Sequence, residues 1–163
     1  MKNSRALNND IQYICSNIME SDYFNRLYGR KHHFNSNVAI HSIRVTNECY
    51  RLAHIMHLDI DKESLIKGAI CHDLALANIK YTFGPKQAIF HSMDSANIAT
   101  NIIGTLSDKE RNIIESHMFP ISPVLPKYKE SWILTLVDKY IATKEILIEP
   151  IIKILTINKK GKI

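Results

Sequence analysis

The residues of this sequence best suited to chemistry are two neighbours, His72 and Asp73, which follow the apolar run 65–70 and Cys71. A neutral imidazole next to a carboxylate offers a metal ion two ligands with almost no loss of chain entropy. The dipeptide alone is a weak indication, because it occurs by chance in many proteins. Four more imidazoles and carboxylates lie in or beside separate segments that we expect to be helical: His41, His91, His117 and Asp138. We therefore predict that all six side chains converge on one interior point.

The chemistry of this set is that of nitrogen and oxygen ligands without a thiolate. Such ligands suit iron, manganese, zinc, cobalt or nickel better than a closed structural zinc site. Four of them would hold one ion, and six are enough for two ions that share a bridging carboxylate. Two ions roughly 3.5–4 Å apart can acidify a bridging water and stabilise both oxygens of a phosphoryl displacement. The sequence has no competing serine or cysteine nucleophile motif, phosphate loop or dinucleotide fingerprint.

The composition favours an ordinary globular protein built from helices. At 163 residues the chain has room for one core, and 45% hydrophobic with 23% charged residues is a typical balance. Only 5 glycines and 5 prolines are present, which disfavours both disorder and a turn-rich β-sandwich or barrel. We predict an all-α fold in which residues 1–163 form a single-domain helical bundle with the metal site in its core.

Charge and hydropathy limit the classes of partner and the cellular compartment that we expect. The formal net charge is +5, but part of the excess lies in the last five residues, and no basic stripe with interleaved aromatic residues occurs. We expect a mild positive field that attracts small anionic substrates, and no nucleic acid as the main partner. No apolar run reaches the roughly 18 residues of a membrane span. The first residues lack the apolar stretch of a secretory signal, so we expect no membrane partner and a cytoplasmic protein.

Helical periodicity and capping residues define the elements that must position the six side chains. The predicted helices span residues 8–24, 38–57, a stretch ending at His72-Asp73, 91–104, 108–117 and 129–148. Their predicted caps are Asn35, Ser36 or Asn37 for the second helix, Asp59 or Asp61 for the third, and a Ser107-x-x-Glu110 capping box for the fifth. The predicted inward stripes include Val38, Val45, Leu52, Ile55 and Met56, then Met93, Ala96, Ile98, Ala99, Ile102 and Ile103, and finally Ile133, Leu134, Leu136, Val137, Tyr140 and Ile141. Asp138 interrupts the last stripe, and a buried carboxylate there requires a partner or a metal.

Several polar residues outside the six are assigned other roles. We expect His32 and His33 to be solvated in a loop, and His54 and His57 to lie outside the site. The loop 81–85 with its flanking lysines, Lys80 and Lys86, is predicted to form the substrate rim. Arg44 and Glu48 continue the polar line from His41 at helical spacing, which indicates a polar cleft. Three prolines, Pro120, Pro123 and Pro126, predict an ordered, extended connection. The cysteines, Cys15, Cys49 and Cys71, have no paired spacing and are expected to be reduced core thiols.

The order and context of these residues resemble the HD-domain superfamily of metal-dependent phosphohydrolases. The words that match are His41-Ser42-Ile43-Arg44-Val45, Ala69-Ile70-Cys71-His72-Asp73 and Leu136-Val137-Asp138-Lys139. The stretches 116–120 and 126–131 are similar to small bacterial HD hydrolases of unassigned substrate. The resemblance covers about residues 35–145 and leaves out the N-terminal helix and the lysine-rich tail. Two further histidines, here His91 and His117, mark the branches of that superfamily that bind two metals.

The resemblance implies a role for each residue. His41, His72, Asp73 and Asp138 would hold the first metal, and Asp73 would bridge to a second metal held by His91 and His117. His72 and Asp73 would be the catalytic pair, and a hydroxide between the metals would attack phosphorus in a nucleotide or another small phosphoester or phosphoanhydride. Arg44 and Lys139 could neutralise phosphate charge. The segment after Asp73, Leu74-Ala75-Leu76-Ala77-Asn78, is more apolar than in many members, so it names no general acid.

Two other functions fit the same six residues. A di-iron pair could perform oxygen chemistry, as in some HD-fold enzymes, or the fold could serve as a nucleotide-binding module without turnover. The amphipathic first helix and the apolar stretch 151–155 could each pack on the core or on a second subunit as a homodimer.

Overall fold

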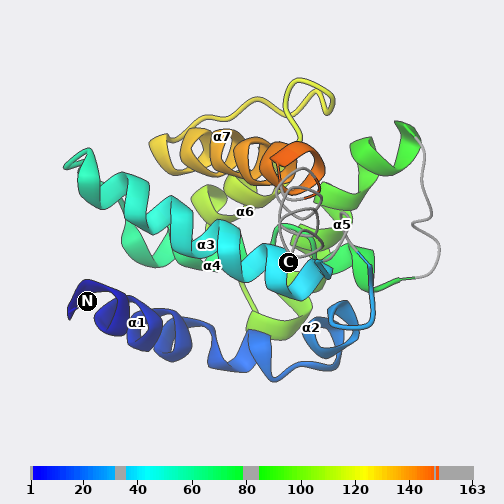
Figure 1. Ribbon diagram of the computed structural model, residues 1–163. Coiled ribbons are helices and arrows are strands. Elements are labelled where there is room, and N and C mark those ends of the chain that lie inside the picture. The colour runs from blue at the N-terminus through cyan, green and yellow to red at the C-terminus, as the bar shows by residue number, and fades with distance from the viewer. Residues whose placement is uncertain (1, 32–35, 79–84, 149, 151–163) are drawn as a thin grey trace, which may run out of the picture.

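The computed structural model of the chain describes residues 2–31, 36–78, 85–148 and 150. Within these ranges the backbone is helical and contains no strand, which confirms the predicted all-α class (Figure 1). The elements are α1 (Lys2–Met19), α2 (Asp22–Leu27), α3 (Val38–Ile55), α4 (Lys62–Cys71), the 3-10 turn η1 (Leu74–Ala77), α5 (Pro85–Ile103), α6 (Asp108–Ser116), α7 (Lys129–Thr143) and the π-helical turn η2 (Lys144–Ile148). In the described ranges, no helix is both apolar and long enough to cross a bilayer.

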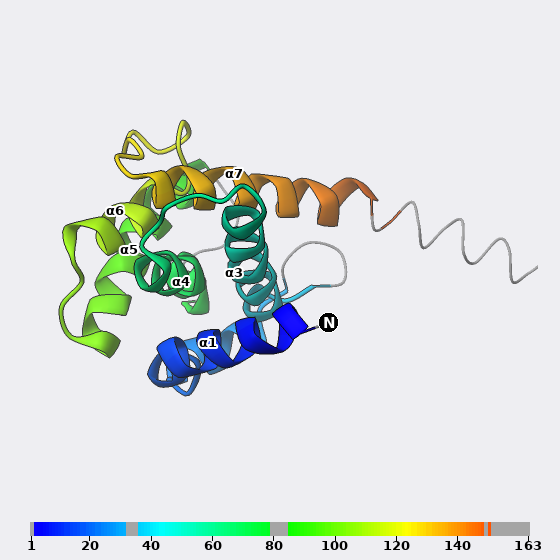
Figure 2. The ribbon, with the colours of Figure 1, turned by 90° about the vertical axis from the view of Figure 1, so that its left-hand side faces the viewer.

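Helix α4 is the centre of the arrangement, because it packs against α1, α3, α5, α6 and α7. Helices α1 and α7 lie on opposite sides of it in both views (Figures 1 and 2). One group of buried apolar side chains joins α4 to α1, α2 and α5, and a second joins α4 to α3, α6 and α7. A short helix covered on several sides must be apolar around most of its surface, which explains the run 65–71.

The predicted caps are present at three helix starts. The side chain of Asn37 accepts a hydrogen bond from the backbone N–H of Ile40, and Asp61 caps α4 through the backbone N–H of Ser64. Ser107 and Glu110 form the complete capping box of α6. Each cap satisfies a backbone donor that the first turn leaves unpaired.

Three helix boundaries differ from the prediction. The first helix is broken, because Ser21 accepts from the backbone N–H of Phe24 and starts α2. Helix α5 starts at Pro85, so His91 lies in its second turn and not at its opening. Proline has no backbone N–H to leave unpaired at the first helical position, and its φ suits a helix, so Pro85 can begin α5. The last helix is α-helical only to Thr143 and continues as η2.

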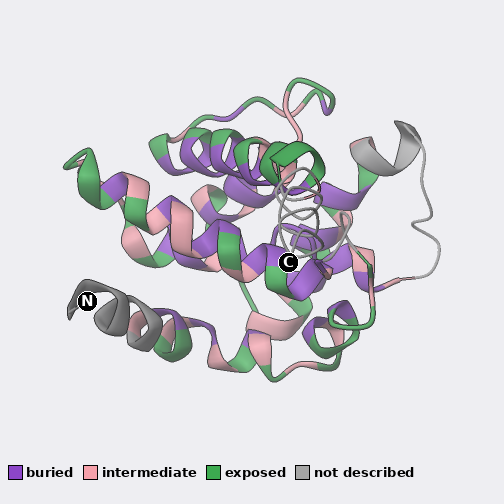
Figure 3. Ribbon diagram, viewed as in Figure 1, coloured by how far each residue is buried: buried purple, intermediate pink, exposed green. Residues whose placement is uncertain are grey.

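Some residues placed in the predicted stripes are exposed. Figure 3 shows buried residues on one side of α7 and exposed residues on the other. Ile133, Leu134, Val137 and Ile141 are buried, whereas Leu136 and Tyr140 are exposed, since 100° per residue turns them away from that face. The other exposed members of the stripes are Ile55, Met56 and Met93. The predicted apolar stripes are wider than the helix faces that neighbouring helices bury.

The connection from α6 to α7 is held by a buried side chain. The Asn112 Oδ1 accepts from the backbone N–H of Lys127 at 2.8 Å and from the Ser131 hydroxyl at 2.8 Å, and its amide donates to the Leu125 carbonyl at 3.0 Å. The connection is therefore ordered, as predicted. It forms turns over 117–121 and has no regular secondary structure over 124–127.

Some of the remaining predictions are confirmed, and the others concern residues outside the described ranges. The three cysteines are buried, free thiols, and burial raises the pKa of each, to about 12 for Cys15. His54 and His57 are exposed and lie outside the site. The predictions for His32, His33, Lys80 and the stretch 151–155 lie outside the described residues, as does the side chain of Lys86.

Candidate metal centre

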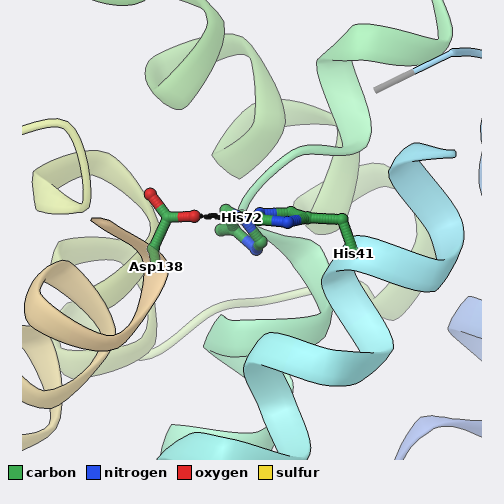
Figure 4. A group of neighbouring side chains, drawn as sticks. All are labelled: His41, His72 and Asp138. Atoms are coloured by element: carbon green, nitrogen blue, oxygen red, sulfur yellow. Dashed lines mark hydrogen bonds and ion pairs between the residues drawn. The ribbon is translucent and has the colours of Figure 1, made fainter. Parts of the chain in front are cut away.

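The structure brings the six predicted side chains together from five helices. His41 comes from the first turn of α3, His91 from α5 and Asp138 from α7, while His72 and His117 cap the C-terminal ends of α4 and α6. Asp73 follows His72 directly. All six are buried, with at most 9% of the residue exposed. Figure 4 shows three of them, His41, His72 and Asp138, pointing toward one another from three different helices.

The first group of donors gathers around His72. The Nε2 atom of His41 lies 3.0 Å from Asp138 Oδ1, and His72 Nε2 lies 3.5 Å from the same oxygen. Asp73 contributes its Oδ2, 3.3 Å from His72 Nε2. Ligand atoms of His41, His72 and Asp138 all lie within 4.8 Å of one another, close enough to bind a single ion.

The second group of donors lies on the other side of Asp73. The Asp73 Oδ1 is 3.2 Å from His91 Nε2 and 3.6 Å from His117 Nε2, and these two nitrogens are 3.0 Å apart. The two oxygens of Asp73 thus face different histidines, Oδ2 toward His72 and Oδ1 toward His91 and His117. This is the arrangement that a carboxylate needs to bridge two cations.

The direction of three imidazoles is fixed by hydrogen bonds from the opposite ring nitrogen. His72 Nδ1 lies 2.7 Å from the Ala69 carbonyl, and His117 Nδ1 lies 2.7 Å from the Ile114 carbonyl. A carbonyl oxygen only accepts, so Nδ1 carries a proton in both rings, and in the neutral form of each ring Nε2 presents its lone pair to the centre. The accepting carbonyls belong to the last turns of α4 and α6, where intrahelical donors run out. The third, His41, has its Nδ1 3.1 Å from a carboxylate oxygen of Glu145.

The donor set fits a transition-metal ion. The Nε2 atom of His72 is buried and makes no hydrogen bond, although two carboxylates lie near it. An unsatisfied buried polar atom costs about 1–3 kcal/mol, which a coordinated cation would remove. Two nitrogens about 2.1 Å from one ion and at right angles would lie about 3.0 Å apart, which is the separation between His91 and His117.

Mutual electrostatics keep three of the donors, Asp73, Asp138 and His117, in the forms that bind metals. Burial would raise the pKa of Asp73 and Asp138, but the neighbouring histidines outweigh burial and hold both carboxyls well below their usual range. Burial, together with the charges of His72 and His91, lowers the pKa of His117 to about 3. Burial opposes the protonation of His72, yet its charge interactions and hydrogen bonds with Asp73 and Asp138 prevail and raise its pKa well above the ordinary value. In the metal-free protein His41 behaves in the same way. Burial opposes its protonation, yet the hydrogen bonds with Asp138 and Glu145 prevail and raise its pKa to about 9.

The pKa of His41 predicts how the stability of the metal-free protein changes with pH. Because the folded-state pKa of about 9 exceeds the ordinary 6.5, the stabilisation is complete below pH 6.5 and is lost as pH rises through 9. The loss is on the order of 3 kcal/mol. Metal binding requires the neutral ring, so apparent metal affinity should rise over the same interval. Thermal unfolding from pH 6.5 to 9, with and without Mn²⁺, measures both the stability of the metal-free protein and its stabilisation by metal. A Tm of the metal-free protein that stays constant or rises over this interval would contradict the predicted loss of stability.

Two cationic residues expected at the substrate already have protein partners. Arg44 Nη1 lies 2.9 Å from Glu145 Oε1, with 45% of the Arg44 side chain exposed. Lys139 Nζ donates to the His117 carbonyl at 2.8 Å and to the Thr135 carbonyl at 3.3 Å, and burial lowers its pKa. Glu48 pairs with Arg51. Glu145 is not among the residues predicted from the sequence, although its seven-residue spacing from Asp138 corresponds to two helical turns on one face.

The comparison with protein families agrees with this geometry. The family model of the HD domain matches residues 38–143, which is more than half of the sequence and includes all six donors. The chain belongs to the HD domain family. HD domains bind divalent metals, and most members are metal-dependent phosphohydrolases. Comparisons with curated proteins and with solved structures gave no significant match. Glu145 lies two residues beyond the matched HD segment.

Proposed function

We propose that this HD domain protein is a phosphohydrolase with two divalent metal ions, iron, manganese or another transition metal, that cleaves a nucleotide or another small phosphoester or phosphoanhydride. The observation that carries the proposal is the division of the Asp73 oxygens between two sets of histidines. A carboxylate buried among three imidazoles can serve two cations at once. Such a pair supplies Lewis-acid polarisation of a phosphoryl oxygen and acidification of water.

In this proposal the protein's own residues build and orient the centre. His41, His72, Asp73 and Asp138 hold one ion, and His91, His117 and Asp73 hold the other. The proton on Nδ1 of His72 stays with the Ala69 carbonyl, so the ring keeps its lone pair on the metal side. Burial of all six residues excludes bulk water, which strengthens electrostatic interactions inside the site. His72 and Asp73 are thus the proposed catalytic pair.

A phosphorylated substrate suits the charges around the centre. The chain has a formal net charge of +5, which favours the approach of anions. Arg44 is the better placed of the two proposed phosphate contacts, because nearly half of its side chain is exposed. Lys139 would have to release the His117 carbonyl to reach a phosphate.

The metal content of the protein tests this proposal. Protein purified without added metal, or loaded with Fe²⁺ or Mn²⁺, should contain about two ions per chain by elemental analysis. The His117→Ala variant should fall toward one ion, because it removes one donor of the second set. His54→Ala, which changes an exposed histidine outside the site, is the matched control and should keep two.

Turnover separates the proposed enzyme from the other two functions. The metal-loaded protein should release phosphate from one or more members of a nucleotide and phosphoester panel, and chelation should abolish that release. Oxygen consumption without phosphate release would indicate a di-iron oxygenase, and nucleotide binding without turnover would indicate a sensor. Absence of metal uptake, or full activity after metal stripping, would overturn the proposal.

A further inference from the structure

Glu145 is a buried carboxylate placed behind a proposed metal ligand. Only 1% of the residue is exposed, although its neighbours Lys144 and Ile146 on the turn η2 are both exposed. Its Oε2 lies 3.1 Å from His41 Nδ1, and its Oε1 lies 2.9 Å from Arg44 Nη1. Burying a carboxylate is unfavourable unless it is paired, so this placement indicates a specific task.

The position of His41 on its helix explains why it needs such a partner. His72 and His117 stand at the C-terminal ends of α4 and α6, where a carbonyl three residues earlier accepts their Nδ1–H. His41 stands in the first turn of α3, where the unpaired backbone groups are N–H donors and not carbonyls. An acceptor for its Nδ1–H must therefore come from another element, and η2 supplies it.

Without that acceptor, His41 would present the wrong nitrogen to a metal. Its Nε2 is 3.0 Å from Asp138 Oδ1, and a neutral imidazole has one N–H to donate. If Nδ1 lost its partner, the proton would move to Nε2 and donate to Asp138, which would block the lone pair. With Glu145 in place, the neutral ring that binds a metal keeps its proton on Nδ1, and the lone pair of Nε2 faces the centre.

We propose that Glu145 is a positioning residue that selects the metal-binding tautomer of His41, and that Arg44 holds the carboxylate in place for this purpose. The inference rests on the proposed function, since it concerns the same metal centre. Arg44 lies three residues after His41 on α3, so both side chains leave the same side of the helix and reach the two oxygens of one carboxylate. Glu145, which lies beyond the matched HD segment, thereby contributes to the site.

The test is a titration of metal-stripped, full-length protein with Mn²⁺ by calorimetry. Glu145→Met keeps the length of the side chain and removes the acceptor, and it should weaken the binding of one ion by about 10–100-fold. Glu145→Gln retains an acceptor oxygen and should recover most of that affinity, which a general loss of packing would not allow. Glu48→Met, which breaks the Glu48–Arg51 pair two turns further along α3, should bind Mn²⁺ as the wild type does.

The outcomes distinguish this inference from the proposed function. Equal Mn²⁺ affinity in the wild type and Glu145→Met, or equally weak binding by Glu145→Gln and Glu145→Met, would overturn the inference alone. A wild-type protein that binds no Mn²⁺ and no Fe²⁺ would overturn both. If circular dichroism shows that Glu145→Met does not fold, Arg44→Met provides the test. This substitution releases the Glu145 carboxylate without changing His41, and it should weaken the binding of one Mn²⁺ ion by a smaller factor than Glu145→Met does. An unchanged Mn²⁺ affinity would overturn the inference.

Discussion

Replacing Asp73 with Asn is expected to abolish metal-dependent turnover and to leave the protein with fewer than two ions. The amide has nearly the same shape, but one of the two oxygens that face separate histidine sets becomes an NH₂ donor. The remaining oxygen can serve only one set. Metal ions provide several kcal/mol of transition-state stabilisation, so the rate should fall at least about a thousandfold. Phosphate release and elemental analysis of the same preparation measure both effects.

The control for this substitution is Asp59→Asn. Asp59 is an exposed aspartate in the turn before α4, and only its backbone carbonyl makes a described contact, with Lys129. The Asp59→Asn substitution should leave metal content and turnover unchanged. Two ions and wild-type turnover in Asp73→Asn would show that Asp73 does not bridge, whatever the rest of the centre does.

Gly68→Ala is expected to destabilise the fold by about 3 kcal/mol, although alanine is the better helix former. A Cβ at this position would lie 2.3 Å from Cγ2 and 2.9 Å from Cβ of Ile113. Both helices are buried at this point, so Ile113 has no room to yield. A loss of this size corresponds to a fall in Tm of roughly 6–12 °C for a chain of this length.

The same substitution should weaken metal binding. His72 lies one turn after Gly68 on α4, and His117 lies one turn after Ile113 on α6. Their ring centroids are 4.9 Å apart. The two imidazoles lie one turn beyond the Gly68–Ile113 contact, so a substitution that separates α4 from α6 at that contact should move the imidazoles apart. Thermal unfolding and Mn²⁺ titration of one variant test the two consequences.

Two other glycines among the described residues, Gly29 and Gly104, provide controls for Gly68→Ala. Gly29 has only the Arg26 carbonyl, at 3.5 Å, near the position of an added Cβ, so Gly29→Ala should change stability little. Gly104 has open space but a φ of 100°, so Gly104→Ala should cost about 1 kcal/mol through backbone strain alone. A Gly68→Ala variant as stable as Gly29→Ala would contradict the predicted clash.

The sequence by itself determined the all-α class, most of the helices and the identity of the six converging side chains. These follow from local physics. Period-3.6 stripes specify helices, and the side chains of Asn37, Asp61 and Ser107 cap their own first turns within three residues. A polar residue such as Asp138 within an apolar helix face predicts a partner in the interior without revealing which one.

Only the tertiary structure decided how the six are divided and what lies behind them. The two oxygens of Asp73 separate the histidines into two sets through contacts between helices far apart in sequence. Glu145 contacts His41, which lies 104 residues earlier in the sequence. Gly68 is required because the Ile113 side chain occupies the space that a Cβ at this position would need. Leu136 and Tyr140 are exposed because no described helix covers their side of α7. Periodicity gives a helix its apolar face, but which element packs on that face, and how closely, depends on the whole chain.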